Sequence, residues 1–312
     1  MNTSPTTEDR TWAVVSHLSS LAFGMGIVLP IIGWSDQRRK SNFGTFQNLQ
    51  ALGYQSLGYT IWLLSYLVIV ILASIIVIAT SGSGGASRAN ADAFRNPGMI
   101  IFLVIVLGMF ALYFILPIIA AIACARGKDF RYPIMGDRLA RYLGYSLVQN
   151  PDEPAWLIED HEFRWVAAMG HFSVLIMIWG MLAPLTAWVL YGKRSFFLKF
   201  QSIQTLVYQA GVTILYFVGT SLYLVGLFGL LASMGQLGGA NSASSFGILG
   251  IVIFGVLLFL GGLIILLIPL FHILGQWAGY RVLKGDNYNY PLVGRLVNKW
   301  ISKQSVSEEK PA

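Results

Sequence analysis

Two ten-residue stretches, FQNLQALGYQ at 46–55 and FQSIQTLVYQ at 200–209, set the organisation of this chain. They align when the sequence is shifted by 154 residues, and each leads into a long run of apolar residues. Other matches, at the same shift or at 158 residues, are His17 with His171, Pro30 with Pro184, Trp34 with Trp188, Tyr132-Pro133 with Tyr290-Pro291, and Gly136 with Gly294. Ordered matches of this kind indicate two tandem copies of one structural unit.

The composition is that of an integral membrane protein. Of the 312 residues, 55% are hydrophobic and only 11% are charged, whereas a soluble domain carries about 25% charged residues. The mean hydropathy is +0.65, and no charged residue lies between Lys40 and Arg88 or between Lys199 and Arg281. Such windows accommodate helices of about 20 apolar residues. The apolar runs do not alternate, which excludes an outer-membrane β-barrel, so we expect an all-α, polytopic helical membrane protein.

Each copy is expected to hold three apolar segments, so that two tandem three-helix repeats pack as a pseudo-symmetric bundle. The segments are 12–34, 47–79 and 98–124 in the first copy, and 165–191, 201–233 and 246–279 in the second. Loops rich in small residues, at 81–96 and 235–245, precede each third segment. The expected division is a polar N-terminal tail at 1–11, a first membrane repeat at 12–146, an acidic linker at 147–163, a second repeat at 164–303 and a polar C-terminal tail at 304–312.

The distribution of Lys and Arg leaves two topologies open. If all six segments cross the membrane, the 21 Lys and Arg residues divide 12 to 9 between the two sides. If the first segment of each repeat enters and returns on one side, 19 lie on that side and 2 on the other. Cytoplasmic loops are enriched in Lys and Arg, which favours the second topology with basic loops in the cytoplasm. The first topology stays open because 23 apolar residues, as at 12–34, suffice to span a bilayer, and inverted repeats are an established transporter design.

His17 and His171 are repeat-equivalent and lie near the start of their apolar segments. Facing imidazoles near a pseudo-twofold axis are suited to binding a haem, a chlorin or a metal ion. The alternative is that each imidazole forms a hydrogen bond to a neighbouring helix. We favour this packing role, because no acid lies nearby in the sequence to orient a ligating imidazole. We therefore expect no resident cofactor and no metal site.

Each copy carries a polar stripe at the start of its second segment. Three side chains recur at i, i+3 and i+7, which places them on one helical face. The stripe either lines a cavity that contacts a substrate or forms hydrogen bonds between helices near the headgroups, and we favour the hydrogen bonds. Its members are Gln47, Gln50 and Tyr54 in the first copy and Gln201, Gln204 and Tyr208 in the second.

Basic and aromatic residues follow the third segment of each copy, and we expect them to bind anionic lipid headgroups rather than nucleic acid. These candidates are Arg126, Lys128, Arg131, Arg138, Arg141, Arg281, Lys284, Arg295 and Lys299. All fourteen Asp and Glu residues lie outside the apolar windows, which argues against a proton relay through acids. The chain has one cysteine, Cys124, and lacks the Walker, HExxH, GxSxG and paired-cysteine motifs. We therefore expect no enzymatic activity.

The repeat unit resembles a widespread bacterial membrane domain that is grouped with the twenty-kilodalton Tic subunit of the chloroplast inner-envelope protein translocon. The residues that carry the resemblance are His17-Leu-Ser19, the Pro-containing run to Trp34, the glutamine-rich stretch 46–55 and Tyr132-Pro-Ile-Met-Gly136. It covers nearly the whole chain, twice, whereas the family usually has a single copy. It implies a helical membrane protein with short loops, and polypeptide translocation only by distant analogy. It implies no catalytic residue.

Two functions of different classes are therefore expected for a protein of a bacterial plasma (inner) membrane. The first is a non-enzymatic structural or accessory subunit that contacts lipid and other membrane protein subunits. The second is a transport or polypeptide-translocation component whose pathway runs along the repeat interface, lined by the glutamine and histidine faces. Replacing Gln50 and Gln204 by leucine is expected to separate them, since a pore would lose transport while still folding.

Overall fold

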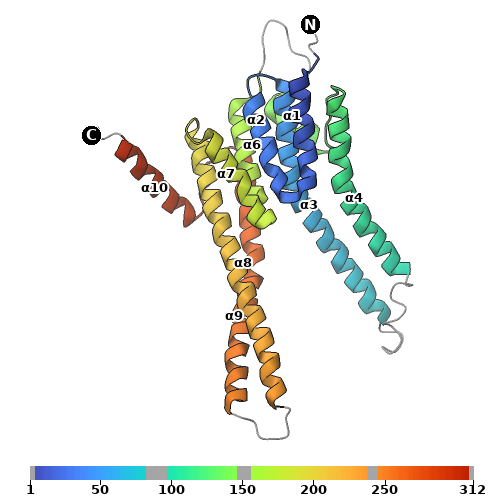
Figure 1. Cartoon of the computed structure of the whole chain (residues 1–312), viewed down its shortest axis with the longest axis vertical. Coiled ribbons are helices and arrows are strands. Elements are labelled where there is room, and N and C mark those ends of the chain that lie inside the picture. Colours follow the sequence, from blue (N-terminus) through green and yellow to red (C-terminus); the bar gives the residue numbers. More distant parts are fainter. Residues whose placement is uncertain (1–3, 82–96, 146–155, 238–244, 309–312) are drawn as a thin grey trace.

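The computed structural model describes residues 4–81, 97–145, 156–237 and 245–308, which form helices joined by short turns (Figure 1). Most of the two expected small-residue loops, residues 147–155 of the expected linker and both chain ends lie outside the described residues. The first repeat comprises α1 (Thr7–Leu18), η1 (Ser19–Ile27), α2 (Val28–Gln37), α3 (Asn42–Ser81), α4 (Pro97–Ala125) and α5 (Met135–Leu143). The second comprises α6 (Glu159–Phe172), η3 (Ser173–Met181), α7 (Leu182–Tyr191), α8 (Phe196–Leu237), α9 (Ser245–Leu283) and α10 (Val293–Glu308). The all-α architecture with a tandem repeat is confirmed.

The first apolar segment of the chain is a helical hairpin. Residues Thr7–Gln37 are long and apolar enough to cross a membrane, but the backbone leaves the helical conformation at Phe23, where φ is 51°. The Gln37 side-chain amide donates a hydrogen bond to the Glu8 carboxylate at 3.3 Å. In one straight helix these residues would lie about 43 Å apart. The chain therefore returns to the end at which it entered.

The equivalent segment of the second repeat, Glu159–Tyr191, also reverses. Met177, with φ 53°, takes the place of Phe23, and the ring centroids of Phe163 and Tyr191 lie only 5.8 Å apart. The α-helical arms of both hairpins are short. Helices α1 and α2 have 12 and 10 residues, and α6 and α7 have 14 and 10, which gives about 15–21 Å. None of these arms spans a hydrocarbon core of about 30 Å.

A close backbone contact at each turn explains where the chain reverses. A Cβ atom on Gly26 would lie 1.8 Å from the carbonyl oxygen of Ser19, and one on Gly180 would lie 2.0 Å from that of Ser173. Only glycine permits this approach. The turns are also tied to the long helices, because Gln55 donates to the Ser19 hydroxyl at 2.9 Å and Gln209 makes the equivalent bond to Ser173 at 3.2 Å.

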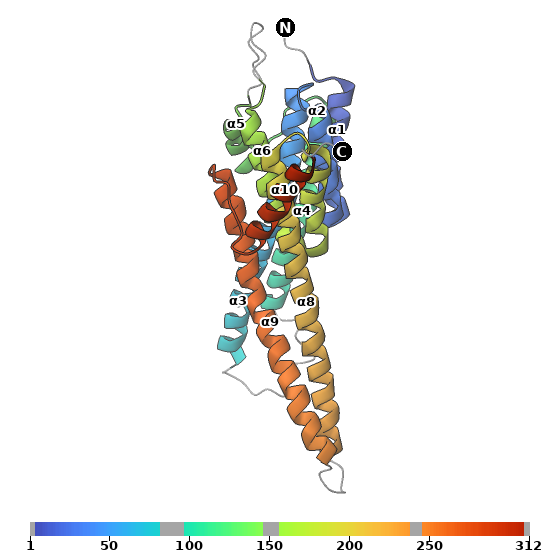
Figure 2. The same cartoon turned by 90° about the vertical axis from the view of Figure 1, so that its left-hand side faces the viewer.

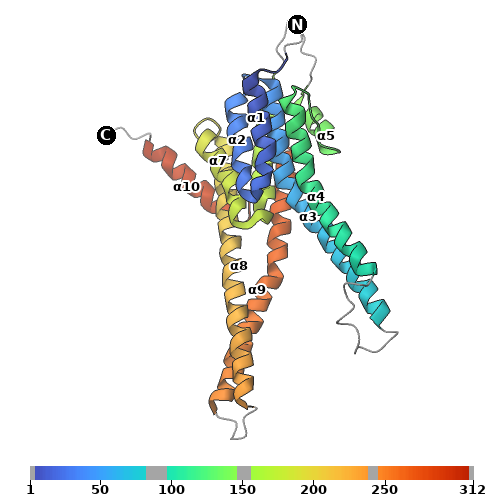
Figure 3. The same ribbon diagram turned by 45° about the vertical axis from the view of Figure 1, so that its right-hand side comes forward.

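Four long helices, α3, α4, α8 and α9, extend beyond the hairpins (Figures 1 and 3). On α8, large exposed hydrophobic side chains recur from Ile214 to Met234, a stretch about 31 Å long at 1.5 Å per residue. This length matches the hydrocarbon core of a bilayer. We therefore place the bilayer core on these extensions, with the hairpin tips pointing toward it.

The two repeats meet through equivalent and non-equivalent elements. Helix α2 packs against α7 and η1 against η3, as expected for a pseudo-symmetric pair, and α3 also packs against α6. A single hydrophobic core joins the repeats, with Trp34 and Leu49 from the first and Trp165 and Tyr191 from the second. Figure 2 shows α5, α6 and α2 gathered at the same end of the molecule. Below this core the α3–α4 and α8–α9 pairs diverge (Figure 1).

The hairpin topology makes a prediction that six crossings do not share. Lys128 and Lys193 are exposed, and cysteines placed there should both react with a membrane-impermeant thiol reagent from the same side. Six crossings would put the two positions on opposite sides. The measurement is labelling of intact cells and of inverted vesicles in a Cys124→Ser background, since Cys124 is the chain's own, buried cysteine.

Candidate functional site

His17 lies at the centre of a buried polar network in the first repeat. Its side chain is fully buried, and both ring nitrogens have partners. Nε2 lies 3.0 Å from Gln47 Oε1, and Nδ1 lies 3.0 Å from the Tyr132 hydroxyl. The network thus ties α1 to α3 and to the segment that follows α4.

The second repeat contains an equivalent network, in which the Thr205 hydroxyl also lies 2.9 Å from His171 Nδ1. His171 is fully buried, with Nε2 at 3.0 Å from Gln201 Oε1 and Nδ1 at 3.0 Å from the Tyr290 hydroxyl. Each imidazole therefore uses both ring nitrogens within its own repeat. Their geometry is that of a packing role.

The hydrogen bonds around Gln47 determine the tautomer of His17. The Gln47 amide nitrogen donates to Asp129 Oδ1 at 2.8 Å and to the Phe130 carbonyl at 3.0 Å. Its Oε1 therefore faces the imidazole and accepts, so Nε2 carries the proton and Nδ1 accepts from Tyr132. A neutral imidazole satisfies every partner, as burial away from water requires.

The second glutamine of each stripe holds a backbone segment in place. Gln50 donates to the Phe130 carbonyl at 2.9 Å and accepts from the Tyr132 N–H at 2.9 Å. Gln204 donates to the Tyr288 carbonyl at 2.7 Å and accepts from the Tyr290 N–H at 3.3 Å. Each amide thus pairs with main-chain groups of a non-helical segment, which have no helical partner of their own.

The tyrosines of the two stripes complete the networks through stacking. The Tyr54 ring stacks on Tyr132 with centroids 4.2 Å apart, and the Tyr208 ring stacks on Tyr290 at 3.9 Å. The structure therefore brings each stripe and its histidine together inside one repeat. The four glutamines are fully buried in these networks, whereas Tyr54 also lines a space between the repeats.

The networks differ at one charged position. Asp129 in the first repeat accepts from Gln47, from Tyr145 at 3.3 Å and from Arg131 at 3.1 Å. Burial raises the pKa of the Asp129 carboxyl, and these donors oppose the shift. The equivalent residue in the second repeat is Asn287, so only the first network contains an acid.

Sequence reasoning found the two histidines and both stripes but did not join them to Tyr132 and Tyr290. The signal was present, because the Tyr-Pro pairs match at a shift of 158 residues. Among the described residues, no group of three or more His, Cys, Asp and Glu side chains is arranged to hold a metal ion. The geometry of both networks serves to hold hairpin, long helix and following segment together.

A family profile matches the chain twice, over residues 8–139 and 162–297. The matches begin one repeat shift apart and together cover most of the chain. The chain belongs to the magnetosome magnetite crystal formation protein family. No curated protein and no solved structure gives a significant match.

Membership of the magnetosome family confirms a bacterial membrane protein with a tandem repeat. It gives no support to the expected relationship with the Tic translocon subunit. It also names a process, crystal formation, that the sequence alone did not indicate.

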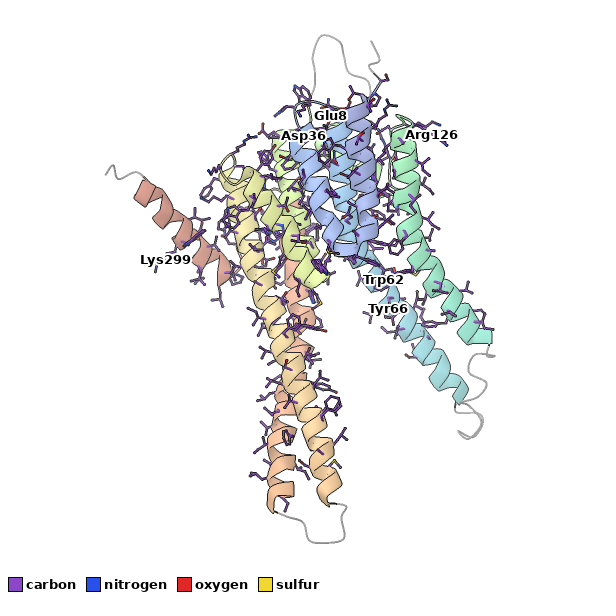
Figure 4. The ribbon with its side chains drawn as sticks, viewed as in Figure 1. Glu8, Asp36, Trp62, Tyr66, Arg126 and Lys299 are labelled. Atoms are coloured by element: carbon purple, nitrogen blue, oxygen red, sulfur yellow. The ribbon has the colours of Figure 1, made fainter. Side chains whose placement is uncertain are left out.

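The candidate headgroup-binding residues of this magnetosome-family protein lie in two settings. Arg131 pairs with Asp129 and Asp137, and Arg281 pairs with Asp286. The others form no ion pair with a described residue and are exposed: Arg126 and Lys128 at the end of α4, Arg138 and Arg141 on α5, Lys284 after α9, and Arg295 and Lys299 on α10. Figure 4 shows Arg126 at the same end as Glu8 and Asp36, and Lys299 on the projecting α10.

A buried carboxylate joins the two repeats of the magnetosome-family fold. Glu162, 1% exposed, accepts from the Trp34 indole N–H at 2.8 Å and from Arg38 Nε at 3.1 Å. Arg38 and Arg39 also pair with Glu159, each at 2.7 Å. These acids lie in the stretch expected to be a linker, and both belong to the first turn of α6.

Replacing Glu162 by glutamine should loosen the junction between the repeats. The amide still accepts from Trp34, but the charged hydrogen bond to Arg38 is lost, which costs about 1–3 kcal/mol. We expect a lower melting temperature for the purified protein. Glu8→Gln, at the repeat-equivalent but more exposed position, is the matched control and should leave the melting temperature nearly unchanged.

Proposed function

We propose that this chain is a non-enzymatic structural or accessory component of the magnetosome membrane that supports magnetite crystal formation. Family membership supplies the process. The structural role is supported by the buried polar side chains of both repeats, whose hydrogen bonds join the hairpin, the long helix and the following segment. His17 and His171 each use both ring nitrogens for this purpose.

The orientation that supports this role places the hairpins and basic loops on the cytoplasmic side. With 19 of 21 Lys and Arg residues there, the chain satisfies the positive-inside rule. The ends of α3, α4, α8 and α9 that lie far from the hairpins then face the opposite side of the membrane. The exposed cations contact anionic headgroups of the membrane, at about 1 kcal/mol per residue.

The transport alternative requires polar side chains along a path between the repeats. The glutamine and histidine side chains expected to line that path are instead buried inside their own repeats. Replacing Gln50 or Gln204 by leucine would leave main-chain groups without partners, so such variants report on folding before they report on transport. The Gln50→Leu and Gln204→Leu variants are therefore no longer suitable for separating the transport function from the structural one.

The proposal is tested by deleting the gene in the bacterium that encodes the chain and measuring crystals by electron microscopy. We expect smaller or misshapen crystals inside vesicles that still form, with recovery when the intact chain is restored. The tagged chain should co-fractionate with crystal-containing vesicles. Unchanged crystals, together with a chain confined to the plasma membrane, would contradict the proposal.

A further inference from the structure

A cavity of about 830 Å³ opens between the two repeats. Its walls come from α3, α4 and α5 of the first repeat and from α6 and α9 of the second. The lining is mainly apolar and aromatic, with Tyr54, Trp62 and Tyr113 on one side and Trp165 and Tyr280 on the other. This volume lies in the range of ligand pockets, about 300–1,000 Å³.

Two cations, Arg138 and Lys284, are the charged members of the described lining. They come from different repeats, are exposed, and form no ion pair within the described part of the chain. Their neighbours Arg131 and Arg281 are by contrast paired with Asp137 and Asp286. The cavity therefore combines an apolar interior with an unneutralised positive charge.

The position of the cavity relative to the bilayer follows from its lining. Ile61 on α3 and Leu112 on α4 line it and are 64% and 56% exposed, and they begin the surface assigned to the hydrocarbon core. Trp62 lies between α3 and α4 (Figure 4), with its ring 6.4 Å from Phe110. The apolar part of the cavity thus continues into the bilayer core, and the cations lie at the headgroup end.

The long helices of the two repeats pack differently beside the cavity. The α8–α9 pair is closed by backbone contact, since a Cβ on Gly226 would lie 2.3 Å from the Leu258 nitrogen. The α3–α4 pair has large aromatic side chains between its helices instead, such as Trp62 and Phe110. These side chains hold the helices apart and leave apolar space that water does not fill favourably.

We propose that this cavity binds a single anionic phospholipid. Arg138 and Lys284 contact the phosphate and anionic headgroup, and an acyl chain lies between α3 and α4 against Trp62 and Leu116. The two cations without an acidic partner, together with the absence of Asp and Glu from the described lining, favour an anionic lipid over a zwitterionic one. Because both repeats supply the cavity walls, the lipid also braces the junction between them.

The test is retention of lipid by the purified full-length chain. The protein is exchanged into detergent with phosphatidylglycerol or with phosphatidylcholine of the same acyl chains, and bound lipid is counted by native mass spectrometry during delipidation. We expect one phosphatidylglycerol to remain per chain after phosphatidylcholine is lost. The variant Arg138→Gln/Lys284→Gln should retain it about tenfold more weakly.

Two further variants make the result specific to the cavity. Arg295→Gln/Lys299→Gln removes the same charge from α10, outside the cavity, and should retain the lipid like the parent chain. Leu116→Trp fills the apolar part and should displace the lipid while keeping both cations. Equal retention of the two lipids by the parent chain, or equal loss of phosphatidylglycerol from the α10 variant and the cavity variant, overturns the proposal.

Discussion

The Gly261→Leu variant should lose the close packing of α8 against α9 and fail to reach a stable fold. A Cβ atom at this position would lie 2.3 Å from the backbone nitrogen of Tyr223 and 2.8 Å from the carbonyl oxygen of Gly219. Neither atom is part of a side chain that can rotate away, so the helices must move apart. Without such contact, association of membrane helices loses the dispersion energy that drives it.

We expect a loss of about 3 kcal/mol or more, the upper end of the cost of overpacking a tight interface. The measurement is thermal unfolding of the purified protein, followed by its helical signal and by its elution in size-exclusion chromatography. Gly255→Leu is the matched control, because a Cβ there meets no atom within 4 Å. It should be as stable as the parent, or slightly more stable through better helix propensity. Equal behaviour of the two variants would contradict the packing described for α8 and α9.

The His17→Leu variant should be the most damaging change within the polar networks. Leucine leaves the Gln47 carbonyl oxygen and the Tyr132 hydroxyl buried without their partner, at about 1–3 kcal/mol for each group. We therefore expect a total loss of about 2–6 kcal/mol. A similar loss is expected for His171→Leu, which has the equivalent partners; its additional neighbour Thr205 keeps a hydrogen bond to the Gln201 carbonyl. The assay is the melting temperature of the purified chain.

His272 provides the control, because its Nδ1 is buried with no hydrogen-bond partner among the described residues. Its replacement by leucine should cost little. A double-mutant cycle with Tyr132→Phe isolates the His17–Tyr132 bond, since the two changes should be less than additive if that bond exists. Additive effects would show that His17 acts without Tyr132, and a coloured or metal-containing parent chain would show that it binds a ligand.

The fold class was predictable because it depends on local composition. Windows without charge, such as 200–280, admit only structures that satisfy the main chain internally. The tandem organisation was equally accessible, since it is a property of the order of residue types. The Lys and Arg distribution favoured hairpins but did not settle the topology. Thr7–Gln37 is long and apolar enough to span a membrane, so its composition does not distinguish a hairpin from a spanning helix.

The candidate site was predictable in part. The spacing of Gln47, Gln50 and Tyr54 places them on one face, and the structure shows them on one face. Their partners were not predictable from spacing, since His17 meets Gln47 across 30 residues and Tyr132 across 115. Contacts between residues this far apart in the sequence depend on how the helices pack, which cannot be read from a single sequence.

Apolar content and repeated residue order are local properties of the chain, and they were enough to predict a helical membrane protein built from two copies of one unit. The packing of the folded chain was needed to show that the first segment of each copy turns back. This reversal rests on backbone contact between Gly26 and Ser19 and between Gly180 and Ser173. The folded structure also showed that the polar stripes hold each repeat together, because buried amides and imidazoles require hydrogen-bond partners that only the packed helices provide.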